Sequence, residues 1–83
     1  MALISKKDIF KIEKARSNVY KQVKASYTVF TSGDQRYFQI DTYGTPDRKM
    51  KDTSSQSIQL DKETAEELIF LLKQAFNIDW LHN

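Results

Sequence analysis

The chain has 83 residues, of which 40% are apolar and 12% aromatic, with a formal net charge of +2 and no cysteine. This composition excludes a disordered chain, and the lack of cysteine excludes disulfides and cysteine-based zinc sites. No apolar run approaches the roughly 18 residues needed to span a bilayer. We therefore predict one domain over residues 1–83 with a small core, in the cytoplasm, with no membrane association.

The net charge hides an asymmetry between the two parts of the chain. Residues 1–51 hold 11 Lys and Arg against 5 Asp and Glu, a balance of +6, whereas residues 52–83 hold 2 against 6, a balance of −4. A basic part favours a surface that binds a polyanion. Attraction between the two parts of the same molecule explains the pattern equally well, so both interpretations stay open.

The first half of the chain predicts a short helix followed by a β-hairpin. Ser5, with Asp8 three residues later, resembles a capping box and predicts a helix to about Ser17, although the alternation over 10–13 also fits a strand. From Val19 to Thr31 the apolar period becomes two, which predicts a strand with a bend near 24–26. A turn at 32–35 and a second strand from Arg36 to Tyr43 follow.

The second half predicts a loop, a short strand and a helix. Residues 44–54 are polar and basic, and Ser55 to Leu60 alternates as a strand does. Asp61 suits the N-cap of a helix that ends near Asn77, with apolar residues at helical spacing. The predicted fold is α+β: an antiparallel sheet of three or four strands, the 61–76 helix packed on one face, and the short N-terminal helix.

The sequence favours a binding protein over an enzyme, and we expect neither a cofactor nor a metal. His82 is the single histidine, and two glycines do not build a phosphate-binding loop. A nuclease-like metal site would need several converging carboxylates, for which Asp41, Asp47 and Asp52 are the nearby candidates. A solvated loop explains these three residues better.

Strand alternation divides the predicted sheet into two faces. We expect one face to meet the helix through Val23, Tyr27, Val29, Phe38, Ile40, Ile58 and Leu60. The other then shows Tyr20, Gln22, Lys24, Tyr37, Gln39, Tyr43, Ser57 and Gln59. Aromatic rings among lysine, glutamine and serine suit single-stranded nucleic acid, because bases stack on rings while cations meet phosphates. A dimer or partner interface is the alternative.

The order of elements carries a resemblance to a known family. The strand over residues 37–43, the basic loop over 47–51, the strand over 57–60 and the helix from Asp61 are together similar to the transcriptional positive cofactor four family. The resemblance covers residues 37–76 and implies a homodimer, paired through the helix, that binds single-stranded DNA along curved sheets and acts in transcription. On matching positions it implies backbone contacts from Lys24, Arg36, Arg48, Lys49 and Lys51, and stacking on Tyr37 and Tyr43.

Two functions follow as expectations. The first is binding of single-stranded nucleic acid, DNA above all, by a homodimer. The second is a small regulatory or inhibitory protein that binds another protein. In that case the contact would be made by the helix stripe of Leu71 and Ala75, or by Trp80 and Leu81 in the tail.

Overall fold

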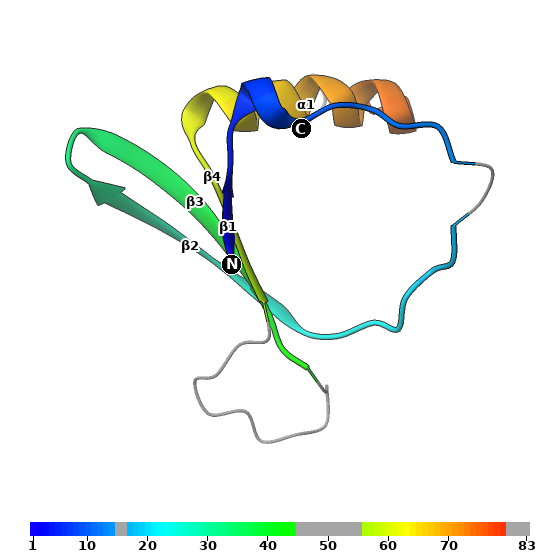
Figure 1. Ribbon diagram of the computed structural model, residues 1–83, viewed down its shortest axis with the longest axis horizontal. Helices are drawn as coiled ribbons and strands as arrows, with labels where there is room; N and C mark the ends of the chain where they lie inside the picture. The colour runs from blue at the N-terminus through cyan, green and yellow to red at the C-terminus, as the bar shows by residue number, and fades with distance from the viewer. Residues whose placement is uncertain (15–16, 45–55, 80–83) are drawn as a thin grey trace.

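One four-stranded sheet and one long helix make up the computed structural model, which describes residues 1–14, 17–44 and 56–79. The elements in chain order are β1 (Ala2–Ile4), the 3-10 helix η1 (Lys6–Asp8), β2 (Ala25–Ser32), β3 (Gln35–Thr42), β4 (Gln56–Leu60) and α1 (Lys62–Phe76). The strands lie in the order β1-β4-β3-β2 (Figure 1). The predicted α+β class is therefore confirmed.

Strands β2 and β3 form the predicted hairpin. Gly33 in its turn has a φ of 64°, a left-handed conformation that glycine adopts without steric cost. The antiparallel register runs from Ser32 opposite Gln35 to Ala25 opposite Thr42. Strand β2 begins at Ala25 instead of Val19, and residues 17–24 have no regular structure. The predicted bend near 24–26 thus marks the place where the strand begins.

The other two strands make the sheet mixed. Strand β4 pairs antiparallel with β3, as predicted, and places Ile58 opposite Ile40 and Leu60 opposite Phe38. Strand β1 pairs parallel with β4, with Ala2 opposite Ile58. The sequence did not predict β1, because three residues show too little periodicity to indicate a strand and their partner lies far along the chain.

The predicted N-terminal helix is reduced to one turn. It begins where expected, at Lys6, but ends at Asp8, and residues 9–14 have no regular structure. The side chain of Ser5 makes no cap hydrogen bond. With a thin apolar face and β-branched Ile9 and Ile12, little remains to stabilise a longer helix.

Helix α1 begins and ends as its sequence predicts. The backbone amide of Thr64 donates to the Asp61 carboxylate over 2.9 Å, which caps the N-terminus. Glu63 in the first turn and Lys73 in the last suit the helix dipole. Asn77 ends the helix in the left-handed conformation, with a φ of 56°. Among the described residues, no helix is long and apolar enough to cross a membrane.

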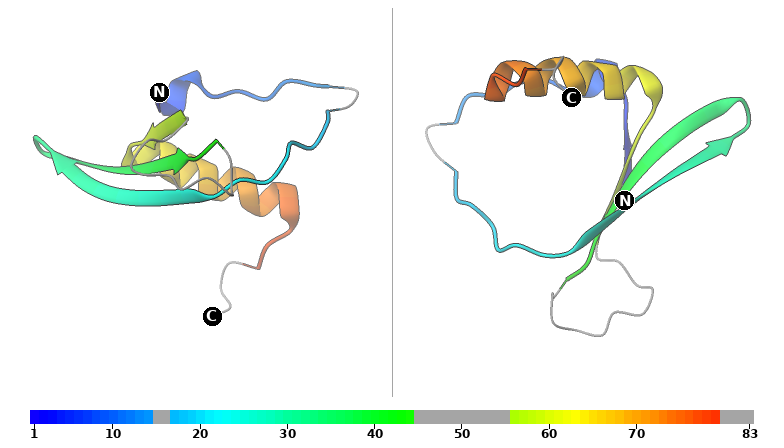
Figure 2. Two further views of the ribbon diagram at one scale, coloured as in Figure 1. Left: turned by 90° about the horizontal axis from the view of Figure 1, so that it is seen from below. Right: turned by 180° about the vertical axis from the view of Figure 1, so that it is seen from behind.

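The helix packs at the edge of the sheet formed by β1 and β4. Its Thr64 hydroxyl donates to the backbone carbonyl of Ile4 over 3.0 Å. Leu60 is the one buried apolar side chain among the described residues, and Thr64 is fully buried. The tip of the β2–β3 hairpin extends past the start of α1 (Figure 2). Much of the sheet therefore lies beyond the reach of the helix.

Candidate nucleic-acid interface

Strand pairing gives the sheet two chemically different faces. Because side chains alternate along a strand and paired residues share a face, the register assigns each one. The apolar face holds Ala2, Ile4, Tyr27, Val29, Phe38, Ile40, Ile58 and Leu60. The polar face holds Leu3, Ser26, Thr28, Phe30, Tyr37, Gln39, Asp41, Ser57 and Gln59. The predicted division is confirmed within the strands, whereas Tyr20, Gln22 and Val23 lie outside the sheet.

The apolar face is largely uncovered. Tyr27 stacks on Phe38 across the hairpin, with ring centroids 5.2 Å apart, yet 69% of Tyr27 remains exposed. Val29 and Ile58 are 44% and 41% exposed. Removing apolar surface from water stabilises a fold or a complex by about 25 cal/mol for each Å². The exposed part of this face does not make that contribution. This face is therefore a surface on which a second molecule would gain free energy by packing.

A line of hydrogen bonds crosses the polar face. The amide nitrogen of Gln59 donates to the Gln39 side-chain oxygen over 2.8 Å, and the amide nitrogen of Gln39 donates to Asp41 over 2.9 Å. The Ser57 hydroxyl donates to the same Asp41 oxygen. The bond from Ser57, followed by that from Gln39, lowers the pKa of Asp41 below its usual value of 3.8. Asp41 is consequently a carboxylate at neutral pH.

Aromatic rings flank this line at both ends. Phe30 and Tyr37 stack with centroids 5.5 Å apart at 29°. At the other end, the Tyr43 hydroxyl lies 2.9 Å from the Ser26 hydroxyl, and the Tyr43 amide donates to the Lys24 carbonyl over 3.0 Å. This backbone hydrogen bond extends the ladder between β2 and β3 by one residue pair, beyond Ala25 and Thr42. Rings, amides and one exposed lysine therefore share a single face.

The structure brings together some of the predicted site residues. Lys24, Tyr37 and Tyr43 belong to the polar face. Arg36 precedes Tyr37 on β3, so its position is on the apolar face, where it helps to line a hollow of about 200 Å³ beside Val29. Arg48, Lys49 and Lys51 lie outside the described residues, as do Asp47, Asp52, Trp80, Leu81 and His82.

Strand alternation in the sequence already puts Phe30 and Asp41 on this face, but neither was counted among the predicted binding residues. The turn at Gly33 fixes which residues of the hairpin are opposite each other. With that register, Phe30 is opposite Tyr37, and Ser26 is opposite Asp41. Asp41 also affects the electrostatics, since its negative charge disfavours a phosphate directly above it.

The helix leaves a second apolar surface open. Phe70 and Phe76 are 55% and 69% exposed, and Leu71 is partly exposed. Leu71 and Ala75 line a hollow of about 600 Å³ together with Ile9 and Phe10. The helix stripe of Leu71 and Ala75, which we predicted as a contact for another protein, is therefore accessible to a partner.

Within residues 1–14, 17–44 and 56–79, no three His, Cys, Asp or Glu side chains converge in a way that would hold a metal ion. Compared with known proteins, the chain matches no family model, no curated protein and no solved structure.

Proposed function

We propose that this protein binds single-stranded nucleic acid, DNA in the first instance, on the polar face of the sheet, and that it does so as a homodimer. The observation that carries the proposal is the chemistry of that face, where the Phe30–Tyr37 pair and Tyr43 flank hydrogen-bonding amides beside Lys24. Every base has an aromatic face, so stacking on such rings does not depend on sequence. The amides offer hydrogen bonds to base edges.

The distribution of charge supports one orientation of the strand. Asp41 lies within the line of hydrogen bonds, so phosphates there would meet repulsion. Bases are neutral and carry donors that a carboxylate and amide oxygens accept. We infer that bases lie over the strands and that the phosphates follow Lys24 and the basic residues Arg48, Lys49 and Lys51.

The uncovered apolar face supports the homodimer. Small domains bury little apolar surface by themselves, and here Leu60 alone of the described apolar side chains is buried. A second copy that packs apolar face on apolar face would cover Tyr27, Val29 and Ile58 in both protomers. That arrangement leaves both polar faces directed outward to bind nucleic acid.

Fluorescence anisotropy of a labelled single-stranded oligonucleotide tests the proposal. We expect binding at low salt, weaker binding to duplex, and a plot of log affinity against log salt with a slope of about −3 if four cations meet phosphates. Replacing Arg48, Lys49 and Lys51 together by alanine should weaken binding and flatten this slope without unfolding the protein. Unchanged affinity would show that the loop makes no phosphate contact.

A tyrosine pair supplies the matched control for stacking. Tyr37→Ala should weaken binding by about 5- to 150-fold, the range expected for the loss of one stacked base. Tyr20→Ala removes the same side chain from an exposed position outside the sheet and should change the affinity little. Absence of any binding at low salt would refute the proposed function.

Binding of another protein is the second candidate, favoured by the exposure of Phe70, Leu71 and Phe76 on α1. Such an interface would be apolar, so moderate salt should leave capture of the partner nearly unchanged. Leu71→Asp should then abolish capture and leave oligonucleotide binding intact. The salt response thus separates the two candidates.

A further inference from the structure

Strand β2 is an edge strand with one side open. It stands at the end of the strand order β1-β4-β3-β2, and β3 alone of the described strands pairs with it, from Ala25 to Ser32 (Figure 1). Helix α1 packs near β4 and η1, at the opposite edge of the sheet. All residues of β2 except Phe30 are exposed. The backbone groups that β2 directs away from β3 are therefore accessible to another strand.

The sequence of β2 lacks the features that usually prevent an edge strand from pairing. Residues 25–32 contain no charged residue and no proline, and their register with β3 has no bulge. The residues that favour extended backbone are Tyr27, Thr28, Val29, Phe30 and Thr31. Strand β1, at the other edge, has three residues and is too short to guide a further strand. A long, uncharged edge such as β2 is a template for strand pairing.

The pairing with β3 determines which residues of β2 direct their backbone groups outward. The Tyr43 amide donates to the Lys24 carbonyl, so these two residues form a hydrogen-bonded pair. Hydrogen-bonded and non-hydrogen-bonded pairs alternate along an antiparallel ladder. The residues that turn their N–H and C=O groups outward are therefore Ala25, Tyr27, Val29 and Thr31. Their alternation gives unpaired donors and acceptors at the spacing of a second ladder.

We propose that β2 pairs with β2 of a second copy of this chain, antiparallel and about a two-fold axis at Thr28. In this register every outward residue is opposite an outward residue, so each pair exchanges both backbone hydrogen bonds. The opposite pairs are Ala25 with Thr31 and Tyr27 with Val29. A register shifted by two positions leaves one outward residue of each copy opposite a residue outside β2. The proposed register is thus the one in which the edge forms the most hydrogen bonds.

The side chains of β2 suit a second copy as the occupant of this edge. Thr28 lies beside its own counterpart on the polar face, and Tyr27 lies beside Val29 on the apolar face. Threonine pairs and aromatic–β-branched pairs both stabilise antiparallel strands. Because β2 has no charge, the two copies bring no like charges together. The strand is therefore complementary to itself in its backbone and in its side chains.

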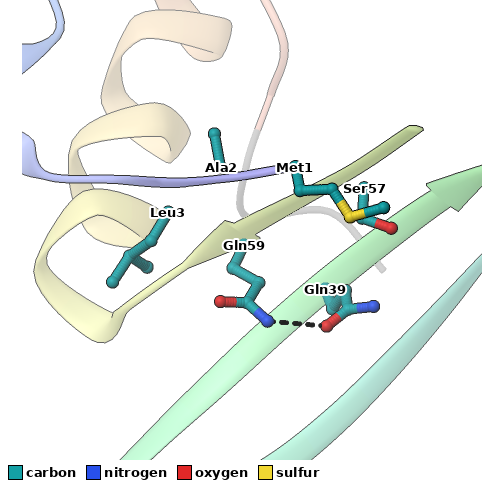
Figure 3. Close-up of a pocket in the computed structure, with 6 residues that line it drawn as sticks. All are labelled: Met1, Ala2, Leu3, Gln39, Ser57 and Gln59. Carbon is teal, nitrogen blue, oxygen red and sulfur yellow. Dashed lines mark hydrogen bonds between the residues drawn. The ribbon is translucent and has the colours of Figure 1, made fainter.

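Edge pairing joins the polar faces of two copies into one surface, because the two-fold axis keeps both on the same side of the sheet. In one copy Gln59 donates to Gln39 (Figure 3), in the direction set by the Asp41 carboxylate, which only accepts hydrogen bonds. Thr28 is opposite Gln39, so this row of polar side chains continues through Thr28 into the second copy. The contact uses the strand edge and not the apolar face, and is therefore separate from the proposed dimer.

Disulfide trapping tests the pairing at one position. The chain has no cysteine, so an introduced thiol reports only on its own position. Thr28→Cys puts two thiols opposite each other, with Cα atoms about 4.5 Å apart, which is within reach of a disulfide. Ser26→Cys, on the same strand and face, puts the two Cα atoms about 13 Å apart, beyond that reach.

After mild oxidation with oxidised glutathione, a non-reducing gel should show a covalent pair for Thr28→Cys and none for Ser26→Cys. Absence of the covalent pair from Thr28→Cys, or equal amounts from both variants, would overturn the inference. Thr28 lies on the polar face, so the apolar-face dimer alone keeps the two thiols apart. No oligonucleotide is used, so a failure of trapping leaves the proposed function to its own test.

Two changes in the Thr28→Cys protein test the backbone bonds. Thr31→Pro removes an outward N–H that the ladder with β3 does not use, so it should keep the circular dichroism spectrum and lose the covalent pair. Thr31→Ala keeps the N–H and should keep the covalent pair. Loss of the pair in both proteins, or in neither, would contradict pairing through the backbone of β2.

Discussion

Thr64 in helix α1 donates its hydroxyl to the backbone carbonyl of Ile4 in strand β1, over 3.0 Å and across 60 positions of sequence. Thr64 is fully buried, and the acceptor belongs to the edge strand of the sheet. A single side chain thus joins the first strand to the last helix. This bond stabilises the position of α1 at the edge of the sheet formed by β1 and β4.

Replacing Thr64 by valine should destabilise the protein. Thr64→Val keeps the shape of the side chain but leaves the Ile4 carbonyl without its donor, at a cost of about 1–3 kcal/mol in the free energy of unfolding. Urea denaturation followed by circular dichroism measures the loss. Thr28→Val makes the same chemical change at an exposed position of β2 and should stay within about 0.5 kcal/mol of the wild type. Equal losses in both variants would contradict the importance of the Ile4 contact.

A lysine at the centre of the apolar face should dissociate the proposed dimer. Val29→Lys buries a charge in the interface and should raise the dimer dissociation constant by at least about 30-fold, or about 2 kcal/mol. Analytical ultracentrifugation over a concentration series measures it. Thr28→Lys introduces the same residue one position away, on the polar face, and should leave the dimer intact. A wild-type protein that is monomeric throughout the series would refute the dimer.

We expect the hairpin turn to require glycine because of its backbone conformation, and not because a side chain there would collide with a neighbour. Gly33 has a positive φ, and no atom lies within 4 Å of the place where a Cβ would be. Gly33→Ala should therefore cost about 1–2 kcal/mol from the left-handed conformation. Gly33→Asn should cost less, because asparagine tolerates this region. Thermal unfolding of the two variants measures the difference, and an equal loss for both would contradict the explanation.

Acid should remove stability that Asp41 provides. The bonds from Ser57 and Gln39 lower the pKa of Asp41 in the folded state, so its contribution is fully present above the usual pKa of 3.8 that the unfolded chain keeps. This contribution is lost as the pH falls through the lower, folded value. The Tm of the wild type should therefore fall more steeply below about pH 4 than that of Asp41→Asn. Parallel Tm curves for the two proteins would contradict the prediction.

Local signals in the sequence determined much of the fold. The helix was predictable because its cap, its dipole charges and its apolar spacing are all contained within residues 61–77. The hairpin was predictable because strand period and turn chemistry lie within a few residues of Gly33. Both are contacts between near neighbours, for which the sequence pattern is itself the physical cause.

The tertiary structure alone determined the contacts between segments that lie far apart in the sequence. Strand β1 exists because β4 offers it a parallel partner, and the N-terminal helix stops after one turn because little packs against it. The sequence placed Gln39 and Gln59 on one face. Their bond, and the direction that Asp41 gives it, depends on the register between β3 and β4. Unlike the hairpin register, the register between β3 and β4 joins residues 20 positions apart, so no local pattern specifies it.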